Sequence, residues 1–440
     1  MIKIFSVMLL LFFFGEVSGL VMASDANESS DFSMDAALFQ NTVMTKEGTG
    51  TGWQPELSPM HAFGYNLNSW NMMMHFNCFT RYLGTDIGGS GNMGANGFSY
   101  PNWLMLMAYK DFKTDGKIMF RTMLSLDRLT DGGNGYPNMF QSGETWQGEL
   151  ITNRQHPHDL VSELSAGYSR SFGVNTGAFS YIAYPGEPAL GPVAYMHRAS
   201  ARNISSAPLT HHWLDSTHIS FGVMTLGFWL NPFKFDASVF NGNEPDENRY
   251  EFDNHELNSA SMRITTNPTK ETSMQVSYAS INAEDQSDKM SKVTASIMQS
   301  IPIYDYIDWD NVNWDITGAW GLNTRSAGPT NALLFESNFQ ANKNSMYLRL
   351  EMVEKTPEEL AILNNGIYDQ NYSVTAVTIG FERDIAGILE HAYSGIMFSL
   401  GAQATLHSFS NDLKPLYGDS PVSAEVYLKI SPKLMQMKGH

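Results

Sequence analysis

The stretch NWDITGAWGLN, residues 313–323, alternates between apolar and polar side chains over almost its whole length. Its large apolar residues fall on one face of an extended chain: Trp314, Ile316, Trp320 and Leu322. Its polar residues fall on the opposite face: Asn313, Asp315, Thr317 and Asn323. The same alternation recurs in SMYLRLEMV (345–353) and VSAEVYLKIS (422–431). A period of two predicts β-strands with one apolar face and one polar face.

The length of these segments indicates where the apolar face lies. Many of them run for ten residues or more, which is the length that a tilted membrane-spanning strand needs. The polar faces carry full charges such as Arg349, Glu351 and Lys429, and these suit a watery lumen. The sequence therefore predicts an all-β fold, a transmembrane antiparallel β-barrel, rather than a soluble sandwich.

Sixteen segments show this pattern, and the loops between them supply an independent test. They are 67–83, 98–111, 116–128, 161–171, 174–184, 216–230, 233–241, 256–266, 270–282, 289–300, 310–324, 328–341, 344–356, 370–384, 391–409 and 419–431. Long connections (84–97, 129–160, 185–215, 242–255) alternate with short ones (KTDG, GV, NP, NPT). Long extracellular loops and short periplasmic turns are typical of membrane barrels. The alternation blurs in the second half, so the predicted count is about 16 strands, within the range 14–18.

The two ends of the barrel region receive separate interpretations. Lys3, the apolar run Ile4–Phe14 and the small-residue site at 21–23 predict a signal peptide over residues 1–23. Residues 24–60 are rich in Ser, Asp, Asn, Gly and Thr, and they predict an extended periplasmic arm. Residues 61–440 then form the barrel in the outer membrane of a Gram-negative bacterium, in contact with lipid and lipopolysaccharide.

Composition limits the partners. The net charge of −18 argues against a nucleic-acid ligand. Cys78 is the single cysteine, so no disulfide forms within the chain. A lumen enclosed by sixteen strands is too wide for side chains to fill, and water or inward-folded loops must occupy it. We expect a monomer whose long loops fold partly into the lumen and whose ligand is a small solute.

Half of the twelve histidines fall between residues 154 and 218. They are His156, His158, His197, His211, His212 and His218. Most lie in the predicted loops 129–160 and 185–215, and His218 is expected to begin the sixth strand and to face the lumen. Imidazole combined with carboxylate suits zinc, whereas imidazole combined with thioether suits copper. Met73, His75, Met119 and Met123 share the face that is assigned to the lumen, so both metals are candidates.

Two other interpretations of these histidines remain open. Buried loops must satisfy their backbone groups, and His, Asn, Arg and Asp side chains are suited to that role. Alternatively Ser162, His158 and Asp159 offer the residue types of a lipid or ester hydrolase at the extracellular rim. Neighbouring residues of an extended strand point apart, and the chain has no G-x-S-x-G turn, so no catalytic residue is assigned.

Several longer motifs resemble those of a family of uncharacterised bacterial outer-membrane barrel proteins. They are GYPNMFQSGET, RQHPHDL, GEPALGPVAYMHR, PLTHHWLDSTHISFGV and FNGNEPDENRY. The resemblance implies a porin-like barrel with no established activity. Some members carry a Met- and His-rich N-terminal arm and are encoded near copper-handling genes, which implies a role in metal homeostasis. Residues 24–59 depart from that pattern, because they contain no histidine and only two methionines, Met34 and Met44.

The favoured function is a porin-like barrel that binds or passes a small solute. Metal ions, copper or zinc, are the favoured solute, held where the six histidines line a constriction. The alternatives are a hydrolase at the extracellular rim and a structural barrel with no path for solutes.

Overall fold

The computed structural model describes residues 37–40, 42–113, 115–253, 256–282, 289–303, 312–362, 370–385 and 395–435. The predicted signal peptide and residues 24–36 lie outside these ranges. No helix in the described ranges is long and apolar enough to cross a membrane.

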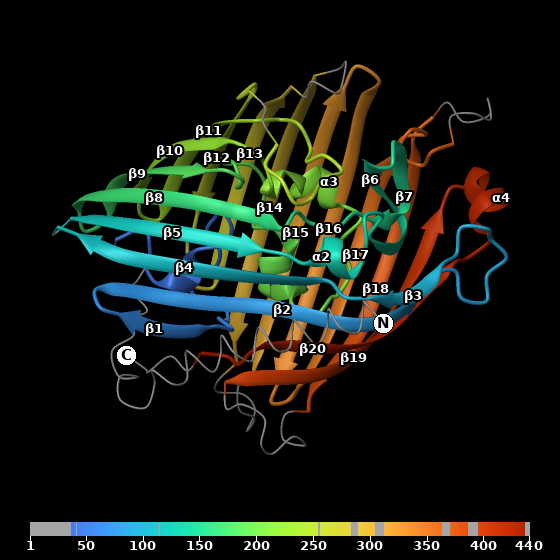
Figure 1. Cartoon of the computed structure of the whole chain (residues 1–440), viewed down its shortest axis with the longest axis horizontal. Coiled ribbons are helices and arrows are strands. Elements are labelled where there is room, and N and C mark those ends of the chain that lie inside the picture. Colours follow the sequence, from blue (N-terminus) through green and yellow to red (C-terminus); the bar gives the residue numbers. More distant parts are fainter. Residues whose placement is uncertain are drawn as a thin grey trace.

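One antiparallel sheet of eighteen strands closes on itself (Figure 1). Its strands are β1 (Phe63–Leu67), β2 (Trp70–Gly84), β3 (Asn96–Ser99), β4 (Asn102–Phe112), β5 (Gly116–Leu124), β8 (Val161–Gly173), β9 (Thr176–Ala183), β10 (Val223–Leu230), β11 (Phe233–Phe240), β12 (Ser259–Thr266), β13 (Thr272–Ile281), β14 (Met290–Pro302), β15 (Asn313–Arg325), β16 (Gly328–Ala341), β17 (Asn344–Lys355), β18 (Tyr372–Asp384), β19 (Ile396–Phe409) and β20 (Val422–Pro432). β3 and β4 pair with the same edge of β2 in succession, and β20 and β1 share its other edge. The eighteen strands therefore fill sixteen positions around the barrel, as the alternation predicts.

Each predicted segment corresponds to one barrel position, although several extend beyond the strand that they contain, and the third and the sixth show why. The third was expected to reach residue 128, but β5 ends at Leu124, where its register with β8 shifts and the helical turn α2 (Asp127–Thr130) follows. The sixth was expected to begin at residue 216, but β10 begins at Val223. His218 instead ends a short 3-10 helix, Ser216–His218, so its predicted place in a strand is wrong.

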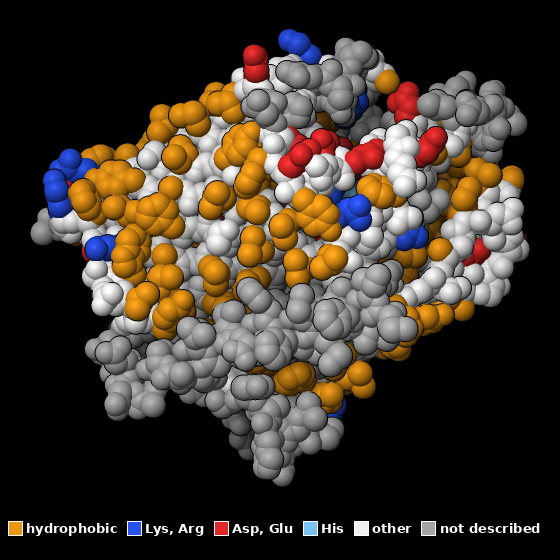
Figure 2. All heavy atoms as spheres, viewed as in Figure 1, with side chains coloured by type: hydrophobic (Ala, Val, Ile, Leu, Met, Phe, Trp, Pro, Cys, Tyr) orange, Lys and Arg blue, Asp and Glu red, His pale blue; other side chains and the backbone are white. Residues whose placement is uncertain are grey.

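The two faces of the strands meet different surroundings. Met346 and Val426 point outward and are 65% and 58% exposed, whereas Arg349 and Lys429 point inward and are almost fully buried. Figure 2 shows hydrophobic side chains spread over the described outer face, with charged ones gathered toward its edges. An apolar outer band and a polar inner face are the arrangement that a lipid bilayer selects in a barrel.

Among the described residues, folded chain occupies much of the lumen and contacts the inward-facing wall. The connection between β5 and β8 carries α2 and the hairpin β6 (Tyr136–Trp146) and β7 (Glu149–Gln155). The connection between β9 and β10, residues 184–222, carries α3 (His211–Leu214) and three 3-10 helices, Tyr195–His197, Ala199–Ala201 and Ser216–His218. α3 packs on β15 and β16 inside the barrel (Figure 1). We call residues 184–222 the lumen loop. The connection between β19 and β20 holds the 3-10 helix Asn411–Leu413 and α4 (Lys414–Tyr417), and it lies at the end of the barrel.

The described residues 37–40 and 42–60, which we call the N-terminal segment, also lie inside the barrel and contain the short 3-10 helix Met44–Lys46. Phe39 and Trp53 are buried and pack edge to face, 5.5 Å apart. Arg121 of β5 donates to the carbonyl oxygens of Gly48, at 3.2 Å, and Gly50, at 2.6 Å. The prediction of an extended periplasmic arm is therefore wrong for this segment, because its backbone carbonyls satisfy cations of the barrel wall.

Candidate functional site

Five of the six candidate histidines come together inside the barrel. We call His156, His158, His211, His212 and His218 the histidine cluster. Their rings form a chain in the order 212, 156, 211, 218, 158, with successive centroids 5.8, 6.4, 5.2 and 5.5 Å apart. The two long loops therefore meet across the lumen at their histidines, as the sequence predicts.

The backbone of each loop sets the positions of its histidines. His156 and His158 follow the end of β7, and Pro157 between them favours an extended backbone at His156. That spacing places both rings on the side that faces the lumen loop. His211 and His212 are the first two residues of the single turn α3, which is short enough to let both rings reach the cluster.

One nitrogen of each ring is fixed by an oxygen atom of the protein. His158 Nδ1 lies 2.7 Å from Asp127 Oδ2, and His211 Nδ1 lies 2.6 Å from Asp215 Oδ1. His218 Nδ1 donates to the carbonyl oxygen of Asp215 at 2.8 Å. Two longer contacts complete the set, His156 Nε2 to Glu144 at 3.3 Å and His212 Nδ1 to Glu244 at 3.4 Å. Such contacts fix the tautomer and the orientation of an imidazole, as they do for histidines that bind metals.

The opposite ring nitrogen of four of these histidines is buried and has no hydrogen-bond partner within the described residues. These atoms are His156 Nδ1 and the Nε2 atoms of His158, His212 and His218. A buried polar atom without a partner costs free energy, so four of them in one place leave room for a ligand or for water. The described residues place no three His, Cys, Asp or Glu side chains close enough to hold one ion together.

The charge state of the cluster favours ligand binding at neutral pH. Burial holds the pKa of His156 well below its usual range, and the neighbouring histidines add to the effect. Burial, with His211 and His158, lowers the pKa of His218 to about 3. Burial acting alone would raise the pKa of Asp215, but Arg198 and His211 together hold it well below its usual range. Neutral imidazoles beside an ionised carboxylate are the forms that bind metal ions.

The sixth candidate, His197, lies apart from the cluster. Its ring is 5.3 Å from that of His75 on β2 and 4.4 Å from that of Trp103 on β4. The prediction that all six histidines line one constriction is therefore wrong for His197, because the 3-10 helix that carries it turns toward the opposite wall.

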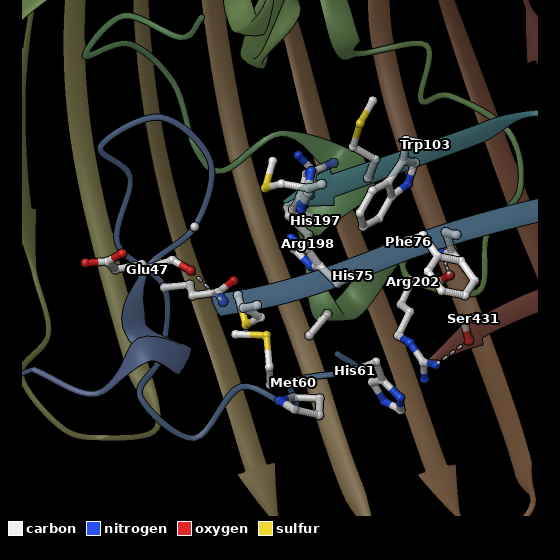
Figure 3. A pocket seen from close by; sticks show the side chains of 18 of the residues that line it. Glu47, Met60, His61, His75, Phe76, Trp103, His197, Arg198, Arg202 and Ser431 are labelled. Atoms are coloured by element: carbon white, nitrogen blue, oxygen red, sulfur yellow. Dashed lines mark hydrogen bonds between the residues drawn. The ribbon is translucent and has the colours of Figure 1, made fainter. Parts of the chain in front are cut away.

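Three cavities are neighbours in the lumen, because the first and second share Trp103 in their linings and the second and third share His61. The first, of about 40 Å³, is lined by Asp127 and His158. The second, of about 80 Å³, is lined by His75 and His197 (Figure 3). The third, of about 220 Å³, is lined by residues of the short β16–β17 turn, 342–343. Arg202 of the lumen loop lines all three cavities.

Arg202 and its surroundings escaped the sequence analysis. The Arg202 Nη2 group donates to Ser431 Oγ on β20 at 3.3 Å, and burial lowers the pKa of Arg202 to about 10, which leaves it charged at neutral pH. No local pattern marks it, since its position depends on how the lumen loop folds. The carboxylates that support the cluster had a weak signal, because Asp215 stands next to three of the histidines in the sequence.

The proposed catalytic group of Ser162, His158 and Asp159 is not assembled. Ser162 Oγ donates to the backbone carbonyl oxygen of Asp159 at 2.9 Å. The carboxylate of Asp159 pairs with Arg249 at 3.1 Å, and His158 pairs with Asp127 instead. These three residues therefore do not form the arrangement that the hydrolase alternative would need.

Comparisons with known proteins find similarity to outer-membrane proteins at the level of overall shape. No family model and no curated protein matches the chain. The porin OmpF of Salmonella typhi, in complex with daunomycin, has a TM-score of 0.49 and 12% identity over 84% of this chain and 100% of its own. An anion-selective porin from Comamonas acidovorans has a TM-score of 0.48 and 8% identity over 82% and 99%. The outer-membrane channel DcaP of Acinetobacter baumannii has a TM-score of 0.44 and 9% identity over 84% and 99%.

The architecture follows from the strands themselves. Sixteen antiparallel positions, an apolar outer face, a polar inner face and short turns at one end make this chain a porin-like outer-membrane β-barrel. Its lumen differs from an open pore, because two loops and the N-terminal segment fold into it.

Proposed function

We propose that this barrel, in the outer membrane of a Gram-negative bacterium, binds a transition-metal ion at the histidine cluster and passes it through the lumen. Zinc or copper is the favoured ion, since imidazole supported by carboxylate suits both. The observation that carries the proposal is the group of four buried imidazole nitrogens without a protein partner, each on a ring whose other nitrogen is held by an oxygen.

Electrostatics support entry from the outside. The side chain of Glu244 is 40% exposed and lies 3.4 Å from His212, whose side chain is 13% exposed. Burial would raise the pKa of Glu244, but its contact with His212 outweighs this and lowers the pKa to about 2. A carboxylate that stays ionised at the mouth attracts cations toward the imidazoles.

The spacing of the imidazole rings favours passage of the metal ion through the cluster rather than its storage there. Neighbouring rings have centroids 5.2–6.4 Å apart, and His211 and His212 are also neighbours at 5.4 Å, so an ion about 2.0 Å from each nitrogen fits between two neighbouring rings. The described side chains place no third ligand within reach. Conduction requires binding that is favourable enough for entry and weak enough for release, which several two-ligand positions in series provide.

Zinc binding to purified protein tests the proposal. The double variant His156→Ala/His158→Ala should lose at least about tenfold in zinc affinity, measured by equilibrium dialysis with elemental analysis. His407→Ala is the matched control, because His407 is also buried but lies on β19, where its ring faces the carbonyl oxygen of Pro421. Equal zinc affinity in the double variant and the wild type, with both folded, would leave packing as the account of the cluster.

Ester hydrolysis by the purified protein would favour the enzyme alternative instead. That activity should then depend on His158, whose contact with Asp127 leaves Nε2 free to act as a base. The absence of both zinc binding and ion current would favour a purely structural barrel.

A further inference from the structure

The second cavity, deeper in the lumen than the histidine cluster, is lined by sulfur and imidazole. Its wall comes from β2 and β4, its opposite side from the lumen loop, and its lower side from the N-terminal segment (Figure 3). The thioethers that line it are Met60, Met73, Met105, Met107 and Met196. Four parts of the chain, namely β2, β4, the lumen loop and the N-terminal segment, therefore contribute methionines to one cavity of about 80 Å³.

The register of β2 with β4 places the wall residues side by side. Met73 is directly opposite Met107, and His75 is directly opposite Met105. All four face the lumen, because their outward neighbours on each strand alternate with them. Directly opposed residues have Cβ atoms about 4.5–5.5 Å apart, so two thioethers and one imidazole can approach a common point.

Two imidazoles complete the lining. His75 and His197 lie with ring centroids 5.3 Å apart, and both Nε2 atoms are buried without a hydrogen-bond partner among the described residues. In Figure 3 these two rings lie beside each other, next to Trp103.

The charges around the cavity disfavour tight binding of a divalent ion there, although they leave its passage open. Glu47 is the one carboxylate among the described lining residues, and its oxygens already accept hydrogen bonds from Tyr109, at 2.8 Å, and from the backbone of Phe39, at 3.4 Å. Arg198 and Arg202 also line the cavity. A site with nearby cations and few carboxylates disfavours a hard or doubly charged ion, whereas thioethers bind soft ions through polarisable sulfur.

We propose that this cavity binds a soft monovalent ion, Cu(I) or Ag(I), through the methionine thioethers and the Nε2 atoms of His75 and His197. The inference rests on the proposed function in one respect, since it places this cavity after the histidine cluster on the proposed route of the metal ion through the lumen. Binding itself requires no passage, and the site stands on its own ligands. It also differs chemically from the histidine cluster, where carboxylates support the rings and no thioether takes part.

Silver ion is the probe, because it is soft, monovalent and inert to oxidation by air. The test variant replaces Met73, Met105 and Met107 with leucine, a substitution that conserves volume and typically costs less than about 1.5 kcal/mol per site. The matched control replaces Met119 and Met123 with leucine. These two methionines are equally buried on the lumen face of β5 but do not line the cavity.

Full-length protein purified in detergent and chloride-free buffer is titrated with Ag(I), and bound silver is measured after desalting. We expect about one silver per barrel, with sulfur and nitrogen neighbours in X-ray absorption, and at least a tenfold weaker affinity in the Met73/Met105/Met107 variant. The Met119/Met123 control should bind silver as the wild type does. The double variant His75→Leu/His197→Leu should retain sulfur neighbours but lose the nitrogen signal.

Equal silver binding in the methionine variant and the wild type would overturn the inference, and so would equal loss in variant and control. The His156→Ala/His158→Ala protein separates the two proposals. Silver binding retained in that protein while zinc binding is lost supports two distinct sites. Silver binding that disappears with the histidine cluster would show that the deep cavity is no independent site.

Discussion

Arg198 in the lumen loop and Glu336 on β16 form a fully buried ion pair, with Nε 2.8 Å from the carboxylate. Arg198 also reaches Asp215 at 2.6 Å, so one guanidinium ties the barrel wall to the residue that orients His211 and His218. Because the wall carboxylate and the loop carboxylate depend on the same cation, the docking of the loop and the geometry of the histidine cluster are coupled.

Arg198→Leu should therefore loosen the loop. Glu336 would keep its pair with Arg349. Among the described side chains, Asp215 would keep only the imidazole of His211. Removing one member of a buried ion pair costs about 3–5 kcal/mol. We expect a lower free energy of unfolding in urea and a higher single-channel conductance. Arg170→Leu is the control, since the Arg170–Asp115 pair is 59% and 37% exposed and should change stability by less than about 1 kcal/mol. Equal effects of the two substitutions would contradict this role of Arg198.

The contact of Asp127 with His158 should contribute measurably to the zinc affinity of the histidine cluster. Asp127→Asn keeps the size of the side chain but weakens the contact that orients His158. Partners of metal-binding histidines typically contribute about 10- to 100-fold to affinity, and zinc dialysis should show a loss of that order. Asp131→Asn is the matched control, because Asp131 ends the same helical turn and accepts from the backbone of Tyr100 instead. An unchanged affinity in Asp127→Asn would separate His158 from metal binding.

Acid should destabilise the cluster. The pKa of His218 is about 3 in the folded protein, below the ordinary value of about 6.5. The unfolded chain therefore takes up the proton first as pH falls, so the stability due to the neutral ring is complete above about 6.5 and is lost as pH falls toward 3. His218→Asn should flatten this dependence, measured as urea midpoints between pH 7.5 and pH 5. A variant with the wild-type slope would assign the acid sensitivity to other groups.

The N-terminal segment should help to block the flow of ions and water through the lumen. Replacing residues 42–54 with a Gly-Ser sequence of the same length removes the side-chain contacts of Thr51 with Asp236 and of Trp53 with Phe39. Because a sixteen-stranded barrel encloses a lumen wide enough for water, conductance should rise several-fold. The same replacement at the exposed loop 88–94 should leave it unchanged. Conductance that does not respond to removal of the segment would assign the block to the loops alone.

Much of the barrel was predictable because the two faces of a strand appear in the sequence as an alternation of apolar and polar residues. The alternation at 313–323 places Trp314 outward and Asp315 inward, and both lie as expected. The inward folding of two long loops and the meeting of their histidines were also predictable, since six histidines fall close together in the sequence. His218 was misplaced because a polar–apolar alternation continues from it into β10, whereas the chain makes a 3-10 turn there.

The remaining features depend on contacts that no local pattern records. Residues 37–60 look like a flexible arm by composition, yet Thr51 bonds to a residue 185 positions away. The methionines of the deep cavity show the same limit. Met73 and His75 were assigned correctly to the lumen face, but Met196 and His197 approach them only after the lumen loop has folded across the barrel.

Arg202 is the expected electrostatic barrier on the path. It lines all three cavities and carries a positive charge at neutral pH, so it opposes cations more than anions. Arg202→Gln removes the charge and nearly conserves the length of the side chain. Cation flux should therefore rise relative to anion flux, which the reversal potential in asymmetric salt measures. An unchanged selectivity would remove Arg202 from the path.

Zinc flux into proteoliposomes that enclose a fluorescent chelator tests the central claim most directly. The wild-type barrel should admit zinc, Arg202→Gln should admit it faster, and His156→Ala/His158→Ala should slow it at least about tenfold. A folded wild-type protein that binds zinc but admits none, or equal flux through all three proteins, would contradict the claim that the histidine cluster and the three cavities form one path.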